Sequence, residues 1–334
     1  MLRFSIIVPV FNRPDEVNEF LESISKQEFR DFELIMVDGS PTEILQPVIE
    51  KYKDQLPLNY IYVKGLGASE SRNLGCEKAL GEYLVFIDSD CIVPETYLAQ
   101  VNKFLLENKV DGFGGPDRAS DSFTPAQKAI NYAMTSLFTT GGIRGKKKHI
   151  GKFQLRGFNM GVSRESFFAI GGFSGMQVAE DIDLSMRLHK AGFTTALIPD
   201  AFVYHKRKTN FKKFHKQLFM HGKGRIDLYL RHKDALKLVH LFPTFFDVYL
   251  VITFLTIFIK PEIFICFFSL IAFYFLLLLF HATWLNKKIS VGLLSTIASF
   301  IMLWAYGNGL LINFIKRIIL KKGSDSKKSV ILKN

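Results

Sequence analysis

Three aspartates stand where strand-like apolar segments end. Asp38 directly follows the apolar run at 32–37, and Asp88 and Asp90 directly follow the run at 83–87. In an extended chain residues i and i+2 point to the same side, so Asp88 and Asp90 can converge on one object. Two such carboxylates repel each other unless a cation or proton lies between them. The spacing therefore predicts a site for a hard, oxygen-seeking cation such as Mg²⁺ or Mn²⁺.

The segments around these aspartates alternate between strand and helix patterns. Strands are expected at 4–11, 32–37, 60–63, 83–87 and 202–204, and helices at 15–27, 68–80 and 180–190. This alternation predicts an α/β fold, with a mostly parallel sheet and helices on both faces. Such sheets bind ligands beyond the carboxyl ends of their strands, where the three aspartates fall. Between 111 and 161 the pattern weakens and glycines cluster, which predicts either a flexible surface segment or a mobile loop over the site.

Several segments, in the same order along the chain, resemble the family 2 glycosyltransferases, which have the GT-A nucleotide-sugar-binding fold. They are Ser5–Asn12, Leu34–Glu43, Gly67–Gly75, Ala79–Asp90 and Gly171–Phe173 followed by Glu180–Leu184. The resemblance covers about residues 3 to 230, and the segment that ends in Asp88-Ser89-Asp90 is its most specific part. It implies a glycosyltransferase of the hexosyltransferase type.

The resemblance also implies a donor site for a nucleotide-diphosphate sugar, expected to be UDP-linked. Its residues would be Pro9, Phe11, Asp38, Arg72, Asp88 and Ser89. Asp38 would bind the uracil or ribose side of the donor, and Asp88 the sugar or ribose. Family members often carry a second aspartate where Gly39 stands, so contacts to the base are expected to be reduced here.

A second group of residues would carry out the sugar transfer itself. By resemblance, Asp90 and His205 would bind Mg²⁺ or Mn²⁺, which stabilises the leaving diphosphate as a Lewis acid. Asp181, beside Glu180, would be the catalytic base that takes the proton of an acceptor hydroxyl. The hydroxyl would then displace the diphosphate with inversion. Asp183 is more simply explained as favourable negative charge at a helix N-terminus.

Processive polymer synthases of this family carry a Gln-x-x-Arg-Trp motif, and this chain departs from it. Gln217 is present, but Met220 and His221 occupy the Arg and Trp positions. We therefore expect transfer of a single sugar. The surrounding basic, glycine-containing run is similar to that of membrane-bound exopolysaccharide transferases.

Positive charge gathers on both sides of the apolar part of the chain. The net charge is +12, and residues 205–237 hold eleven Lys/Arg against two Asp. Residues 316–334 add seven Lys/Arg against one Asp. This placement is typical of contact with anionic membrane lipids. No nucleic-acid-binding motif accompanies the charge, so nucleic acid is not an expected partner.

Three apolar segments follow residue 237, at 238–259, 263–285 and 289–315. The last two contain no Asp, Glu, Lys or Arg, and each exceeds the roughly 20 residues that cross a bilayer. Buried core helices are the alternative. Three spans would place the basic C-terminus outside, against the positive-inside rule. Two spans, with 238–259 interfacial or re-entrant, are therefore preferred.

These patterns predict three parts: a GT-A domain at 1–237 that includes the basic membrane-proximal segment 205–237, a membrane region at 238–318 and a basic cytoplasmic tail at 319–334. The N-terminus does not resemble a signal peptide, so a multi-pass protein of the cytoplasmic membrane with a cytoplasmic catalytic domain is expected. The acceptor would be a glycan or lipid-linked glycan of exopolysaccharide, capsule or lipopolysaccharide assembly. The alternatives are transfer to polyprenyl phosphate and a non-catalytic membrane scaffold.

Overall fold

The computed structural model describes residues 2–118, 123–140, 149–206 and 210–323. Contacts divide this part of the chain into two compact units. The sheet unit holds 2–118 and 149–206, and the helical unit holds 123–140 and 210–323. Each unit is described by itself.

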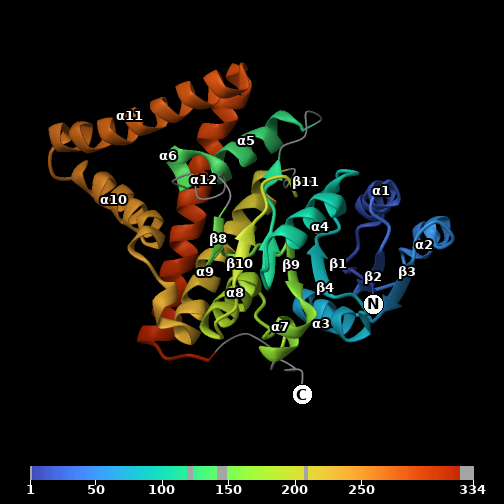
Figure 1. Ribbon diagram of the computed structural model, residues 1–334. Coiled ribbons are helices and arrows are strands. Elements are labelled where there is room, and N and C mark those ends of the chain that lie inside the picture. Colours follow the sequence, from blue (N-terminus) through green and yellow to red (C-terminus); the bar gives the residue numbers. More distant parts are fainter. Residues whose placement is uncertain (1, 119–122, 141–148, 207–209, 324–334) are drawn as a thin grey trace. The chain divides into compact units, whose positions relative to one another are not determined.

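The sheet unit is built on a mixed eight-stranded sheet with strand order β3-β2-β1-β4-β9-β6-β10-β8 (Figure 1). Its strands, in the order of the chain, are β1 Phe4–Val10, β2 Phe32–Asp38, β3 Leu58–Tyr62, β4 Tyr83–Ile87, β6 Gly112–Gly114, β8 His149–Gly151, β9 Asn159–Ser163 and β10 Thr195–Leu197. The strands β3, β2, β1 and β4 run parallel to one another. The carboxyl ends of β2 and β4 therefore lie at the same edge, with β1 between them.

A second, three-stranded sheet has the order β5-β11-β7. Its strands are β5 Cys91–Ile92, β7 Asp117–Arg118 and β11 Val203–His205. The antiparallel pairing of β11 with β5 sets His205 opposite Cys91. This small sheet thereby brings a histidine from the end of the sheet unit to the loop that follows β4.

Helices cover both faces of the large sheet because strand side chains alternate between the faces. Ile6 and Val8 of β1 face the core under α1 Pro14–Ser25, α2 Gln46–Tyr52 and α4 Tyr97–Glu107. Ile7 of β1 and Phe86 of β4 face the opposite core, under α3 Ala68–Lys78, α7 Arg164–Ala169 and α8 Glu180–Lys190. Both cores are buried, so the strand ends are held rigidly.

The helical unit is centred on the apolar helix α12. Its elements are α5 Pro125–Thr135, α6 Leu137–Thr140, α9 Phe211–Arg231, the short 3₁₀ turns Lys233–Ala235 and Leu238–His240, α10 Phe242–Thr256, α11 Pro261–Asn286 and α12 Ile289–Phe314, which a π-helical turn extends to Ile319. α11 and the extended α12 are long and apolar enough to cross a membrane. That finding by itself is weak evidence for membrane spans.

The α/β class and the helices on both faces are confirmed, but the sheet is mixed rather than mostly parallel. Its antiparallel pairs are those of β9 with β4 and β6 and that of β8 with β10. The weak pattern between 111 and 161 concealed β9, together with β6, β7 and α5. The described residues there form regular elements rather than one flexible surface segment or one loop over the site. Part of this segment, 141–148, lies outside the described residues, as does most of the predicted tail 319–334.

Candidate active site

Asp38 ends β2 and is fully buried. Its Oδ1 accepts a hydrogen bond from the Ser40 amide at 2.8 Å, and its Oδ2 accepts one from the Tyr60 hydroxyl at 2.8 Å. The Asn12 amide in turn donates to the Ser40 hydroxyl oxygen at 2.7 Å, which joins the ends of β1 and β2. Two of the other predicted donor residues lie on β1 or just beyond it: Pro9 is within the strand, and Phe11 follows it with its side chain more than half exposed.

Asp88, Ser89 and Asp90 form the turn between β4 and β5. The Cys91 amide donates to the Asp88 carbonyl at 3.0 Å, and the Asp88 amide lies 3.4 Å from the Phe158 carbonyl oxygen. Ser89 and Asp90 are buried, while a third of the Asp88 side chain is exposed. The turn thus presents Asp88 to solvent and keeps Asp90 inside.

Arg72 of α3 connects Asp88 with the start of α8. Its guanidinium donates to Asp88 Oδ1 and to Glu180 Oε1, at 2.9 Å in each case. It also lies over the Phe173 ring, 5.5 Å from the centroid, and the residue is only 3% exposed. Arg72 is therefore held by two carboxylates rather than extended toward open solvent.

Glu180 and Asp181 begin α8, after Ala179 in a left-handed conformation at φ 64°. Asp181 Oδ2 accepts a hydrogen bond from the Gly157 amide at 3.0 Å. Gly157 also lies beside Arg72: a Cβ atom on this glycine would stand 3.4 Å from Arg72 Nη2 and 3.8 Å from Asp181 Cβ. Asp88, Glu180 and Asp181 therefore gather around one arginine and one glycine.

Burial raises the pKa of Glu180 from 4.5 to about 7, with Asp181 adding to the rise and Arg72 opposing it. A carboxyl group that titrates near neutral pH suits proton transfer. Asp183, one turn further along, instead bonds Ser174 and Arg187 at 2.7 and 2.9 Å. Its carboxylate is engaged inside the protein, away from a role in transfer.

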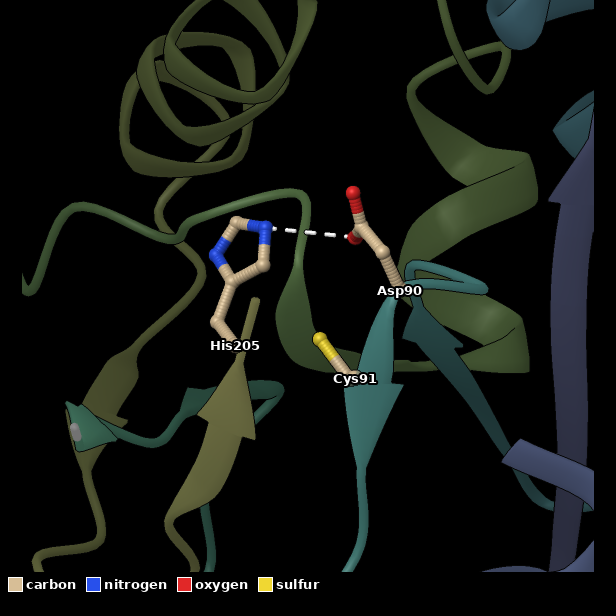
Figure 2. Close-up of side chains that lie close together, drawn as sticks. All are labelled: Asp90, Cys91 and His205. Atoms are coloured by element: carbon tan, nitrogen blue, oxygen red, sulfur yellow. Dashed lines mark ion pairs between the residues drawn. The ribbon is translucent and has the colours of Figure 1, made fainter. Parts of the chain in front are cut away.

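Asp90 and His205 point toward one another (Figure 2), with His205 Nε2 3.2 Å from Asp90 Oδ1. Arg13, at the start of α1, forms an ion pair with the other oxygen, Asp90 Oδ2. The Phe158 ring stacks on the His205 ring at 5.0 Å between centroids, and His205 Nδ1 is buried without a hydrogen-bond partner among the described residues. These contacts fix the imidazole beside the carboxylate.

The residues around Asp90 fit a divalent cation. Candidate ligand atoms of Asp90, Cys91 and His205 all lie within 4.8 Å of one another. Burial raises the pKa of Cys91 well above its usual value, so its thiol stays protonated and is a poor ligand. One carboxylate oxygen and one imidazole nitrogen remain, and Mn²⁺ or Mg²⁺ would complete its coordination with phosphate oxygens and water.

Four contributors were missed in the sequence. Arg13 follows β1 at the same sheet edge as the aspartates, so the strand-end rule could have found it. Tyr60 could have been found as a polar group on the strand beside Asp38. Gly157 and Phe158 carry no local signal, because their importance comes from contacts with Arg72, Asp181 and His205.

Comparisons with known proteins identify the family. Residues 5–171 match the family model described as "Glycosyl transferase family 2". An uncharacterised glycosyltransferase of Haemophilus influenzae is 30% identical over 208 residues, 60% of this chain and 67% of that protein. The poly(ribitol-phosphate) β-N-acetylglucosaminyltransferase TarS of Staphylococcus aureus is 32% identical over 115 residues, 33% of this chain. That match spans only 20% of the length of TarS.

Among solved structures, the mannosyltransferase PcManGT from Pyrobaculum calidifontis, in complex with GDP-Man and Mn²⁺, superimposes with a TM-score of 0.62. The match covers 92% of this chain and 86% of PcManGT, at 17% sequence identity. This likeness supports the fold alone, which is the expected GT-A-like fold. The family model, by contrast, covers half of the chain and includes Asp38, Arg72, Asp88 and Asp90. The chain therefore belongs to glycosyl transferase family 2.

Proposed function

We propose that the protein transfers a single sugar, with inversion, from a nucleotide-diphosphate sugar to an acceptor hydroxyl. The observation that carries this proposal is the junction at Arg72. One guanidinium bonds Asp88, at the proposed donor side, and Glu180, beside the proposed base. The donor sugar and the acceptor hydroxyl would have to meet here for the hydroxyl to displace the nucleoside diphosphate directly.

Each group has a proposed role. Asp38 binds the nucleoside, expected to be uridine, and Asp88 orients the ribose or the sugar. Asp90 and His205 hold Mg²⁺ or Mn²⁺, which would neutralise the leaving diphosphate when bound. Asp181 accepts the proton from the acceptor hydroxyl. Its hydrogen bond from the Gly157 amide fixes the carboxylate and leaves it further lone pairs for that proton.

The proposed acceptor is a glycan or lipid-linked glycan at the cytoplasmic face of a membrane. α10 and α11 expose many large apolar side chains, such as Phe258 and Phe268, more than a protein in water alone can leave uncovered. Lys212, Lys213 and Lys216 of α9 are exposed in the same helical unit and suit anionic headgroups.

The test is metal-dependent turnover of nucleotide sugars by the full chain in membranes. We expect release of nucleoside diphosphate from one nucleotide sugar, loss of that release in chelator, and recovery with Mn²⁺ or Mg²⁺. Asp90→Asn should reduce turnover by about two orders of magnitude or more while the thermal unfolding midpoint stays near that of the wild type. Full activity in chelator, or in the variant, would exclude the metal role.

A further inference from the structure

The helices of the helical unit differ sharply in how much of their apolar surface is covered. In the most apolar 18-residue stretch of α11 only 6% of the stretch is buried, whereas 39% of the corresponding stretch of the extended α12 is buried. α10 and α11 meet at a turn around Lys260, where Phe258 is 86% exposed. Most of the uncovered apolar surface therefore belongs to the hairpin formed by α10 and α11, here called the apolar hairpin.

α12 is instead packed against two helices that carry polar faces. Ala298 and Met302 share one buried cluster with Ala129 of α5 and Leu218 of α9. Further along, a Cβ atom on Gly222 of α9 would stand 2.1 Å from the Tyr306 carbonyl oxygen, so the two backbones are in direct contact. Because α9 exposes Lys212, Lys213 and Lys216, a complete crossing by α12 would draw these charges into hydrocarbon.

α5 and α6 also hold the carboxyl-terminal half of α11. The Tyr132 hydroxyl of α5 lies 2.8 Å from His281 Nδ1, and Tyr132 packs with Leu278 and Ala282. The Tyr274 hydroxyl donates to the carbonyl of Phe138 in α6 at 3.1 Å. The α11–α12 turn follows within six residues of Ala282, about 9 Å of helix, and so lies beside α5.

Chain length fixes the side of the membrane on which α5 must lie. Four residues, 119–122, join Arg118 of β7 to Phe123. Even fully extended, that connection spans at most about 18 Å, less than the roughly 30 Å of bilayer hydrocarbon. α5 therefore begins on the same side of a bilayer as β7. The contacts of Tyr132 with His281 and of Phe138 with Tyr274 show that the chain from α5 to α6 runs antiparallel to α11. The α11–α12 turn therefore lies toward the start of α5, on that same side. Two spans formed by α11 and α12 would put that turn on the opposite side.

We infer that the protein inserts the apolar hairpin into a single leaflet of an anionic phospholipid bilayer and that neither α11 nor α12 crosses it. This inference rests on the membrane association in the proposed function and specifies its geometry. α10 has 15 residues, about 22 Å of helix, and is too short to place the hairpin turn on the far side of the bilayer. Lys260 and Glu262 at that turn stay at headgroup level when the hairpin lies in the plane of the leaflet.

Substituted-cysteine labelling distinguishes the arrangements. The full chain carries Cys266→Ser, because Cys76 and Cys91 are buried and Cys266 is exposed. Single cysteines are added as Lys53→Cys in the sheet unit, Glu262→Cys at the hairpin turn and Lys288→Cys at the α11–α12 turn; all three positions are exposed. A membrane-impermeant maleimide is applied to spheroplasts and to inverted vesicles of a bacterial host.

We expect all three cysteines to react in inverted vesicles and to stay unlabelled in spheroplasts. Labelling of Lys288→Cys in spheroplasts would mean that α11 and α12 span the membrane, and would overturn the inference. Labelling of Glu262→Cys in spheroplasts would mean that α10 and α11 cross the membrane. Protection of this cysteine in both preparations would place the hairpin turn in hydrocarbon. Either result would overturn the inference. Recovery of Lys53→Cys protein in the soluble fraction would instead reject the membrane association itself.

Discussion

Arg72 Nη1 lies 2.9 Å from Glu180 Oε1, and both side chains are largely removed from water. The same guanidinium reaches Asp88, so its charge is shared between two carboxylates that lie far apart in the sequence. This sharing leaves Glu180 less stabilised as an anion than an exclusive ion pair would. Burial, the main cause of the raised pKa of Glu180, therefore outweighs the shared arginine.

The first prediction concerns pH and Glu180. Its pKa is about 7 in the folded chain against 4.5 ordinarily, so the folded state retains a proton that the unfolded state loses between these values. Stability should therefore fall as pH rises from 4.5 to 7, by up to about 3 kcal/mol. Thermal unfolding of the wild type and Glu180→Gln at pH 5 and pH 8 measures this. The wild type should lose more stability than the variant, and parallel changes would refute the assignment.

The second prediction separates donor binding from transfer. Asp181→Asn keeps an oxygen that can accept the Gly157 amide but lacks the basicity to take a proton. We expect kcat to fall about 10²- to 10⁴-fold, with the Kd for nucleoside diphosphate changed less than about twofold. Calorimetry and a transfer assay measure the two quantities. Transfer at the wild-type rate would remove Asp181 from the role of base.

The third prediction concerns Arg13, which neutralises one oxygen of Asp90. Because a divalent cation and this guanidinium compete for the same carboxylate, Arg13→Gln should bind Mn²⁺ about three to ten times more tightly in the absence of nucleotide. Electron paramagnetic resonance of free Mn²⁺ during titration measures the affinity.

Arg3→Gln is the matched control for Arg13, since Arg3 pairs with Glu82 at the opposite end of β1. That variant should leave Mn²⁺ affinity unchanged. Weaker Mn²⁺ binding by Arg13→Gln would show that Arg13 supports the site rather than competes for it.

Much of the site was predictable from the sequence because strand ends are local features. The apolar runs before Asp38 and Asp88 are recognisable in isolation, and parallel pairing through β1 brings them to one edge. β9 was not predictable in this way. It is short, contains Gly161 and is defined by its pairing with β4 and β6 rather than by its own composition.

The two long apolar helices show a second limit of sequence reasoning. By hydropathy and length both 263–285 and 289–315 qualify as membrane spans, because neither quantity takes account of neighbouring helices. The difference comes from α5 and α9, which cover α12 and leave most of α11 exposed. Those contacts join residues more than 80 positions apart in the chain, and no local pattern contains them.

The fourth prediction tests the contact between α9 and α12. A Cβ atom at Gly309 would stand 2.1 Å from the Phe219 carbonyl oxygen, so Gly309→Ala must push the helices apart. We expect a loss of about 1–3 kcal/mol, seen as a lower unfolding midpoint in detergent or lipid. Gly323→Ala meets nothing within 4 Å and should be neutral. Equal stability of the two variants would contradict the packing of α9 on α12.

Tyr132 and His281 bond across 149 positions of sequence, and this separation bears on how the chain is made. A ribosome releases α5 long before α11 exists, so the apolar face of α5 stays uncovered during most of translation. The helical unit can close only after nearly the whole polypeptide has emerged. Chains that end prematurely before α11 should therefore be captured by chaperones or degraded, even when the sheet unit has already folded.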